Sequence, residues 1–306
     1  MVEIRAVENR VQELFGEGIV HGTTHLCTGQ EAVAVGVAST ARPTDHVTAT
    51  YRGHGVALAL GLTPTSLVGE IMGREIGSIG GVGGSMHLCD MSIGLMPTFA
   101  IVGAGIPVAV GAALTAQVRG TDDIGIAVFG DGSTNIGAFH EALNLAAIWN
   151  LPTVFVCENN QYGEYSKTEV TTPITDIAER AASYGMPGII ADGQDCDVVV
   201  ETMNGAIDRA RSGGGPSLLE FKTYRYAGHS RSDTAPYRPE GEFEEWFKKD
   251  PIATFAARLV SERILTQQQV EDIDSEVATR IASAVETVKA SPAARVAAMF
   301  DNITTN

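Results

Sequence analysis

The sequence predicts an α/β fold, in which a parallel sheet carries helices on both faces. A strand–helix–strand unit supports this most directly: an apolar run at 124–129, a helical pattern at 137–149 and a second apolar run at 153–157. Two strands joined in this way by a helix lie parallel, with a right-handed crossover. The same alternation continues further along the chain, in apolar runs and a helical pattern at 188–191, 197–211 and 217–221.

The N-terminal part of the chain is predicted to consist of helices and loops. Val7, Val11 and Leu14 recur with helical spacing and predict an amphipathic helix at the N-terminus. From about 30 to 72, helical patterns alternate with loops. Residues 73 to 107 are rich in glycine and show little periodicity. We therefore expect a long loop region there, and such loops in compact domains are usually functional.

The C-terminal part is predicted to be helical. A polar loop runs from the last apolar run to about Pro239, and Thr266 with Gln269 forms a capping box at the start of a long helix. Apolar residues then recur at helical spacing. We expect residues 1–240 to form the α/β domain and residues 241–306 to form a helical extension packed on it, not a separate domain.

Composition limits the classes of partner. The 306-residue chain has a formal net charge of −16, and binding to nucleic acid or to an anionic membrane needs Lys and Arg, so neither is expected. No apolar run approaches the roughly 20 residues of a membrane span, and the charged, helical N-terminus does not read as a signal peptide. The four cysteines are widely spaced, which predicts reduced thiols and a cytoplasmic location.

Polar residues follow both strands of the strand–helix–strand unit. Asp131 follows the first strand and Asn160 follows the second, so both are expected at the carboxyl edge of the sheet, where ligands bind. A carboxylate and an amide oxygen suit Mg²⁺ that is shared with a phosphate. Gly130 and Gly132 let a phosphate approach, and the N-terminus of the next helix favours an anion. Either motif alone also fits an ordinary turn.

Several motifs together carry a family resemblance. Gly130-Asp131-Gly132 and the later Asn159-Asn160 resemble the signature of thiamine-diphosphate enzymes. Other motifs, in the same order, are similar to one branch of these enzymes, the alpha subunits of pyruvate, branched-chain 2-oxo acid and acetoin dehydrogenases. These motifs are His25–Ala32, Tyr51–Gly55, Gly83–His87, Ile101–Ala104, Phe139–Ala146, Leu151-Pro152 and Tyr224–Asp233. The resemblance implies the thiamine-diphosphate-binding fold, with residues 1–240 as the cofactor-binding domain.

The resemblance implies thiamine diphosphate and Mg²⁺ as cofactors. Asp131 and Asn160 would bind Mg²⁺ through side-chain oxygens, and Tyr162 would bind it through its backbone carbonyl. Gly132 and Ser133 would offer backbone N–H groups to the diphosphate.

The same resemblance assigns further cofactor contacts. Arg52 would pair with a phosphate, for which a guanidinium fork is suited, and Tyr51 would add its hydroxyl. The backbone of Ala100 would contact the pyrimidine, and Val102 would hold the cofactor in a bent shape. Considered alone, Arg52 also fits a surface ion pair and Val102 also fits packing in the core.

Two histidines are implied at the reacting end of the cofactor. His229 would contact the cofactor and take part in acyl transfer or in ordering its loop, since imidazole exchanges protons near neutral pH. His25 would lie near the substrate. Ser230 matches a position where some relatives carry a regulatory phosphoserine. Considered alone, His229 also fits an ordinary exposed loop histidine.

The implied activity belongs to the alpha subunit of a 2-oxo acid dehydrogenase. Such an enzyme decarboxylates a small-molecule 2-oxo acid and transfers the acyl group to a lipoyl-bearing acyltransferase component. A beta subunit supplies the activating glutamate in this family, so an α2β2 heterotetramer is expected. Val82 and Ala227 depart from the pyruvate-type pattern, which leaves a transketolase-like enzyme, passing a two-carbon unit to a carrier protein, as the alternative. A non-catalytic scaffolding subunit and a nicotinamide-dependent dehydrogenase fit the motifs less well.

Overall fold

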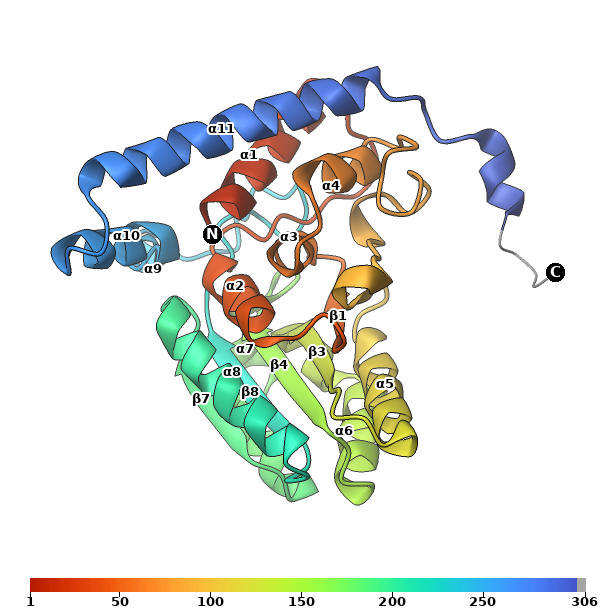
Figure 1. The fold of residues 1–306 in the computed structure, drawn as a ribbon. Coiled ribbons are helices and arrows are strands. Elements are labelled where there is room, and N and C mark those ends of the chain that lie inside the picture. Colours follow the sequence, from red (N-terminus) through yellow and green to blue (C-terminus); the bar gives the residue numbers. More distant parts are fainter. Residues whose placement is uncertain (302–306) are drawn as a thin grey trace.

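The computed structural model describes residues 1–301, and a sheet of six parallel strands lies at its centre (Figure 1). The strand order is β2-β1-β3-β4-β8-β7. These strands are β1 (His46–Thr50), β2 (Leu95–Phe99), β3 (Gly125–Gly130), β4 (Thr153–Asn159), β7 (Gly188–Asp192) and β8 (Ser217–Lys222). A separate antiparallel hairpin consists of β5 (Tyr162–Gly163) and β6 (Ser166–Lys167). The predicted α/β class with a parallel sheet is confirmed.

Two hydrophobic cores, one on each face of the sheet, explain the continuous apolar runs of the central strands. In β4, Val154 and Val156 belong to one core, whereas Phe155 and Cys157 belong to the other. The first core includes residues of α1 (Val2–Gly16), α2 (Glu31–Thr40), α3 (His54–Leu60) and α8 (Cys196–Arg211). The second includes residues of α5 (Gly105–Arg119), α6 (Gly137–Ile148) and the 3-10 helix η4 (Ile177–Tyr184). Successive side chains point to opposite faces, so a strand covered on both faces is apolar throughout.

Two strands of the parallel sheet are absent from the sequence-based prediction, as are the two short strands of the hairpin. β1 lies within 30–72, where only helices and loops are expected, and β2 lies within the long loop expected at 73–107. Both expectations are wrong at these strands. β1 alternates polar residues such as Thr48 and Thr50 with apolar ones, and β2 contains Pro97, which lacks an N–H group. β2 is an edge strand, where proline is tolerated, so its sequence lacks the usual strand signal.

A buried carboxylate organises the glycine-rich loop between α4 (Pro64–Ile71) and β2. Glu70 is fully buried. Its two carboxylate oxygens accept hydrogen bonds of 2.6–3.2 Å from the backbone N–H groups of Ile79, Gly81, Gly83 and Gly84. A Cβ atom at Gly77 would lie 2.4 Å from a Glu70 oxygen, so a glycine is required there. The short 3-10 helices η1 (Gly84–Met86) and η2 (Met91–Ile93) complete the segment.

The C-terminal part consists of α9 (Glu242–Phe247), α10 (Pro251–Ser261), α11 (Gln267–Ala290) and the 3-10 helix η5 (Val296–Phe300). The predicted capping box is confirmed, because the side chains of Thr266 and Gln269 each accept a hydrogen bond from the other residue's backbone N–H. Figure 1 shows α11 running across α1 and α4. Val277, Ile281 and Val285 of α11 join the first core.

The predicted boundary at residue 240 lies directly before α9. Residues of α11 pack in the first core, as expected of an extension that is not a separate domain. The division into residues 1–240 and 241–306 stays a prediction, and residues 302–306 lie outside the described part of the chain. Within residues 1–301, none of the helices is at once long and apolar enough to cross a membrane.

Candidate active site

The predicted site residues converge at the carboxyl edge of the sheet. Five neighbouring strands end there, and the loops after β1, β2, β3, β4 and β8 carry Arg52, Val102, Asp131, Asn160 and His229 respectively. The strand order reverses at β1 and β3, which is where ligands bind in such sheets. A cavity of about 450 Å³ opens at this edge. All of the site residues predicted from the sequence line it: His25, Tyr51, Arg52, Ala100, Val102, Asp131, Gly132, Ser133, Asn160, Tyr162 and His229.

Neighbouring side chains orient the two predicted metal ligands. Thr168 Oγ1 donates to Asp131 Oδ2 at 2.8 Å, and the side-chain amide of Asn160 donates to Gln30 Oε1 at 2.9 Å. The Tyr162 N–H donates to Asn160 Oδ1 at 3.3 Å, which folds the chain back after β4. Burial raises the pKa of the Asp131 carboxyl. One carboxylate and one amide oxygen form a sparse set that suits Mg²⁺ when phosphate supplies further ligands.

Two buried arginines place positive charge in the lining of the cavity, which also contains the carboxyl groups of Asp131, Glu158 and Glu164. Arg52 donates to the carbonyl oxygens of Leu26 and His229. Arg225 donates to the Glu164 carbonyl oxygen at 3.0 Å and to the Tyr237 hydroxyl at 2.9 Å.

Burial and the nearby Arg225 lower the pKa of Arg52 to about 10, so it stays protonated at neutral pH. Within residues 1–301, both guanidiniums bond only to uncharged acceptors. Buried cations are stabilised by a hydrogen-bonded anion, so this arrangement fits a diphosphate.

The two predicted catalytic histidines lie side by side. The ring centres of His25 and His229 are 5.0 Å apart, and the ring centres of His25 and Tyr51 are 4.3 Å apart. Burial and the positive charge of Arg52 lower the pKa of His25 to about 3 and that of His229 to about 4, with Arg225 adding to the effect on His229. Both imidazoles are therefore neutral at pH 7. His25 Nδ1 is buried and has no hydrogen-bond partner in the described part of the chain.

The remaining lining is apolar or formed by glycine. Val102 is 43% exposed, so packing in the core does not explain it, and that alternative is wrong. A Cβ atom at Gly132 would lie 3.3 Å from the Gly163 Cα, so glycine eases the approach of these two segments. Gly132 lies within a 3-10 turn, η3 (Asp131–Asn135), and α6 begins at Gly137, as the sequence predicts.

Other lining residues carry no role in the sequence-based prediction. Arg225, Glu158 and Glu164 line the cavity, and Gln30 and Thr168 orient the predicted metal ligands. Burial raises the pKa of Glu158 to about 7. Gln30 and Arg225 lie within motifs that carry the resemblance, and Glu158 lies directly before one. Their positions could therefore have marked them as candidate site residues, but their contacts are known only from the fold. Ser230 is not part of the lining.

The sequence is similar to known proteins along nearly its whole length. A family described as "Dehydrogenase E1 component" matches residues 1–297. The chain is 44% identical over 293 residues to the alpha subunit of acetoin:2,6-dichlorophenolindophenol oxidoreductase of Bacillus subtilis, covering 95% of this chain and 87% of that protein. The corresponding subunit of Cupriavidus necator is 42% identical over 293 residues, with 95% and 88% coverage. The alpha subunit of the pyruvate dehydrogenase E1 component of Rhizobium meliloti is 36% identical over 304 residues, with 99% and 87% coverage.

Proposed function

Since this chain belongs to the dehydrogenase E1 component family, we propose that the cavity at the carboxyl edge of its sheet is the diphosphate-binding half of a thiamine-diphosphate site. The chain is an alpha subunit of a thiamine-diphosphate-dependent dehydrogenase and works with a beta subunit, as its relatives do. These relatives do not favour the transketolase-like alternative. The observation that carries the proposal is the pair of buried guanidiniums, Arg52 and Arg225, which bond only to uncharged acceptors within residues 1–301.

The polar edge of the cavity holds the diphosphate in this proposal. Arg52 and Arg225 supply the positive charge. The metal ligands for Mg²⁺ are the side chains of Asp131 and Asn160 and the backbone carbonyl of Tyr162. Backbone N–H groups come from Gly132 and Ser133, a hydroxyl comes from Tyr51, and contacts to the rings come from Ala100 and Val102. Bound thiamine diphosphate supplies a carbanion and an electron sink for decarboxylation.

The two histidines lie at the reacting end as neutral imidazoles. With pKa values of about 3 and 4, His25 and His229 are neutral at pH 7, so each has a ring nitrogen that can accept a hydrogen bond. Neutral imidazoles also avoid adding charge next to Arg52. The positions support a role for His229 in acyl transfer and for His25 near the substrate.

The substrate class follows from the relatives. The family supports decarboxylation of a 2-oxo acid with transfer of the acyl group, and we propose a lipoyl group on a separate acyltransferase component as the acceptor. Acetoin is a second candidate substrate, because the two relatives named for acetoin are 44% and 42% identical, against 36% for the relative named for pyruvate. An α2β2 assembly and a cytoplasmic location also remain proposals.

The first test is calorimetric titration of thiamine diphosphate into the chain co-purified with its beta subunit, with and without Mg²⁺. We expect binding that requires Mg²⁺, and a dissociation constant at least about 10-fold weaker in Asp131→Asn. Asp122→Asn is the matched control, because this exposed aspartate lies in a surface ion pair with Arg42. Absence of binding to the folded wild-type assembly would overturn the proposal.

A further inference from the structure

Two loops, here called the histidine loops, bring His25 and His229 together. Residues 24–30 carry the first histidine and residues 223–231 carry the second, and the two rings meet edge to face at 76°. Backbone hydrogen bonds join the loops, from the Tyr226 N–H to the Thr28 carbonyl at 2.9 Å and from the Arg231 N–H to the Thr24 carbonyl at 3.1 Å. The relative position of the loops therefore sets the relative position of the histidines.

The closest approach of the histidine loops is at Gly29. Its φ is +96°, and a Cβ atom there would lie 2.3 Å from the Tyr224 carbonyl oxygen. Such a contact leaves no room for even a methyl group, so glycine is required. Because the loops are in contact, a displacement of one loop displaces the other.

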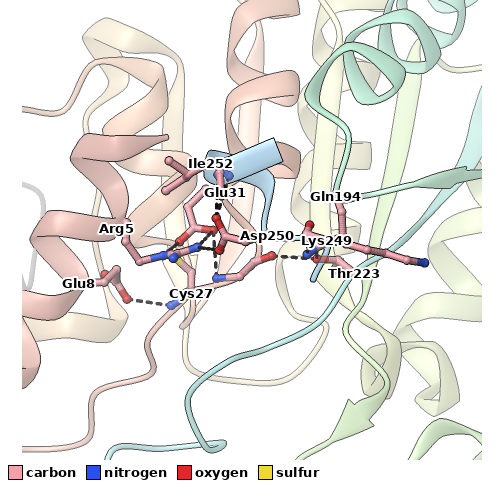
Figure 2. A network of polar contacts seen from close by, with 11 residues as sticks. Arg5, Glu8, Cys27, Glu31, Gln194, Thr223, Lys249, Asp250 and Ile252 are labelled. Atoms are coloured by element: carbon pink, nitrogen blue, oxygen red, sulfur yellow. Dashed lines mark hydrogen bonds and ion pairs between the residues drawn. The ribbon is translucent and has the colours of Figure 1, made fainter. Parts of the chain in front are cut away.

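Arg5, on α1, connects these loops to α10 (Figure 2). Its guanidinium bonds both carboxylate oxygens of Glu31, with the Nη2–Oε2 distance at 2.9 Å, and Nη2 also donates to Asp250 Oδ2 at 2.9 Å. Glu31 is fully buried and Asp250 is 5% exposed. A buried charge that loses its partner is strongly destabilising, so the three side chains hold one another in a defined geometry.

Each member of this network contacts another segment. Glu31 Oε2 accepts the Gly29 N–H at 3.0 Å in the first histidine loop. The Arg5 guanidinium lies 5.0 Å from the centre of the Tyr226 ring in the second loop. Asp250 caps α10 by accepting two backbone N–H groups. One guanidinium thus joins both histidine loops and the start of α10.

None of Arg5, Glu31 and Asp250 lines the cavity, so any effect on the reaction is transmitted through the histidine loops. We propose that Arg5 is a positioning residue for the histidine pair: it fixes the two histidine loops against each other through Glu31 and Tyr226 and ties them to α10 through Asp250. This inference rests on the proposed roles of His25 and His229.

The test uses the chain assembled with its beta subunit and compares Arg5→Met with Arg10→Met. Both variants remove one guanidinium from α1, but among the described residues Arg10 pairs only with Glu13 and Glu17, at the surface. We expect Arg5→Met to lower kcat about 100-fold, the loss typical of a small misplacement of catalytic groups, while KM and the cofactor dissociation constant change less than about threefold. Arg10→Met is expected to match the wild type. Unchanged kcat in folded Arg5→Met would overturn the proposal.

Two conservative variants separate positioning from folding. Asp250→Asn keeps the helix cap but loses the ion pair, and is expected to lower kcat about 10-fold. If Arg5→Met does not fold, this variant decides, and wild-type kcat in it would contradict the proposal. Arg5→Lys keeps the charge but cannot span two carboxylates as a fork, so it should restore activity only in part. Full activity in Arg5→Lys would also contradict it.

Hydrogen exchange distinguishes failure of this inference from failure of the proposed histidine roles. In Arg5→Met we expect the amides of Tyr226 and Arg231 to exchange at least about 10-fold faster than in the wild type. Equal rates would overturn the positioning role, whatever the activity. If His229→Ala keeps full turnover, the proposed role of that histidine fails instead, while faster exchange in Arg5→Met still supports the link between the loops.

Discussion

Two groups of histidines in this molecule differ in their partners, and of the three residues His25 and His54 are buried whereas His229 is half-buried. His54, on α3, places Nδ1 2.6 Å from Glu8 Oε1 and Nε2 2.9 Å from Ser85 Oγ. His25 and His229 instead lie against aromatic rings and arginines. Burial alone would lower the pKa of all three, but the carboxylate of Glu8 outweighs burial and raises the pKa of His54. The pKa values of the other two are lowered.

The difference separates a structural histidine from two that are available for chemistry. Both ring nitrogens of His54 are occupied, and Glu8 also accepts the Cys27 N–H at 2.7 Å, so this pair joins α1, α3 and the first histidine loop. His25 Nδ1 has no hydrogen-bond partner within residues 1–301. Buried polar atoms are normally satisfied, and a catalytic role is one explanation for an exception. The partners of His25 and His54, which are both buried, distinguish the two roles.

The largest expected effect is on turnover in His229→Ala. We expect kcat of the assembled enzyme to fall by about 10²–10⁴-fold, the usual contribution of a proton-transferring side chain. The free energy of unfolding should change by less than about 1 kcal/mol, because the ring has no carboxylate partner. Steady-state kinetics and urea unfolding of the same preparation measure both. His140→Ala, at an exposed position on α6, is the control and should keep wild-type kcat; a loss of stability without a loss of turnover would reverse the comparison.

The reverse pattern is expected for His54→Leu. This change leaves the Glu8 carboxylate buried without its cationic partner, so the free energy of unfolding should fall by about 3–5 kcal/mol. Urea unfolding measures the loss. The double variant Glu8→Leu/His54→Leu removes both charges and should recover part of the stability. A change below about 1 kcal/mol in the single variant would show that the pair is not structural.

The last expected effect is on the dependence of stability on pH. His25 and His229 have folded-state pKa values of about 3 and 4, below the ordinary 6.5, so the unfolded chain binds more protons between about pH 4 and 6.5. The stability linked to their neutral forms is complete above pH 6.5 and is lost as the pH falls. The raised pKa of His54 has the opposite sign, so its contribution is complete below pH 6.5 and is lost as the pH rises.

These opposing contributions predict that the part of the stability linked to these three histidines is greatest near pH 6.5. Each histidine changes the free energy of unfolding by less than about 1.4 kcal/mol per pH unit, the limit for one proton. The urea midpoint of unfolding, measured as a function of pH, should vary less steeply below about pH 6.5 in His229→Ala than in the wild type. In His54→Leu it should vary less steeply above about pH 6.5. If the slope of the urea midpoint below about pH 6.5 is the same in His229→Ala and in the wild type, the lowered pKa of His229 is contradicted.

The sequence predicts the centre of the fold better than its edge. β3 and β4 are covered on both faces and are therefore continuous apolar runs, and Asp131 and Asn160 follow them in the expected way. β1 and β2 lack that signal, although their ends position Arg52 and Val102. The family resemblance assigned those residues without the strands that place them.

Contacts between distant segments account for the residues that were missed. Gln30 orients Asn160 across 130 positions of sequence, and no local pattern reports such a contact. Arg225 is notable because its guanidinium, within residues 1–301, has only uncharged acceptors, which becomes visible only when its surroundings are known. Periodicity reports burial of an element, whereas the partners of a buried polar group depend on the whole fold.

The carboxylate of Glu70 has a consequence for glycine-rich loops. Converging backbone N–H groups form a concave nest, which commonly binds a phosphate or another anion from solution. Here the chain fills the nest with its own side chain, so the loop already has its counter-ion when the protein folds. Added phosphate would find these amides occupied. A cluster of glycines can thus mark a loop that binds one of its own carboxylates, whereas the buried arginines Arg52 and Arg225 are the groups that suit an anion from solution.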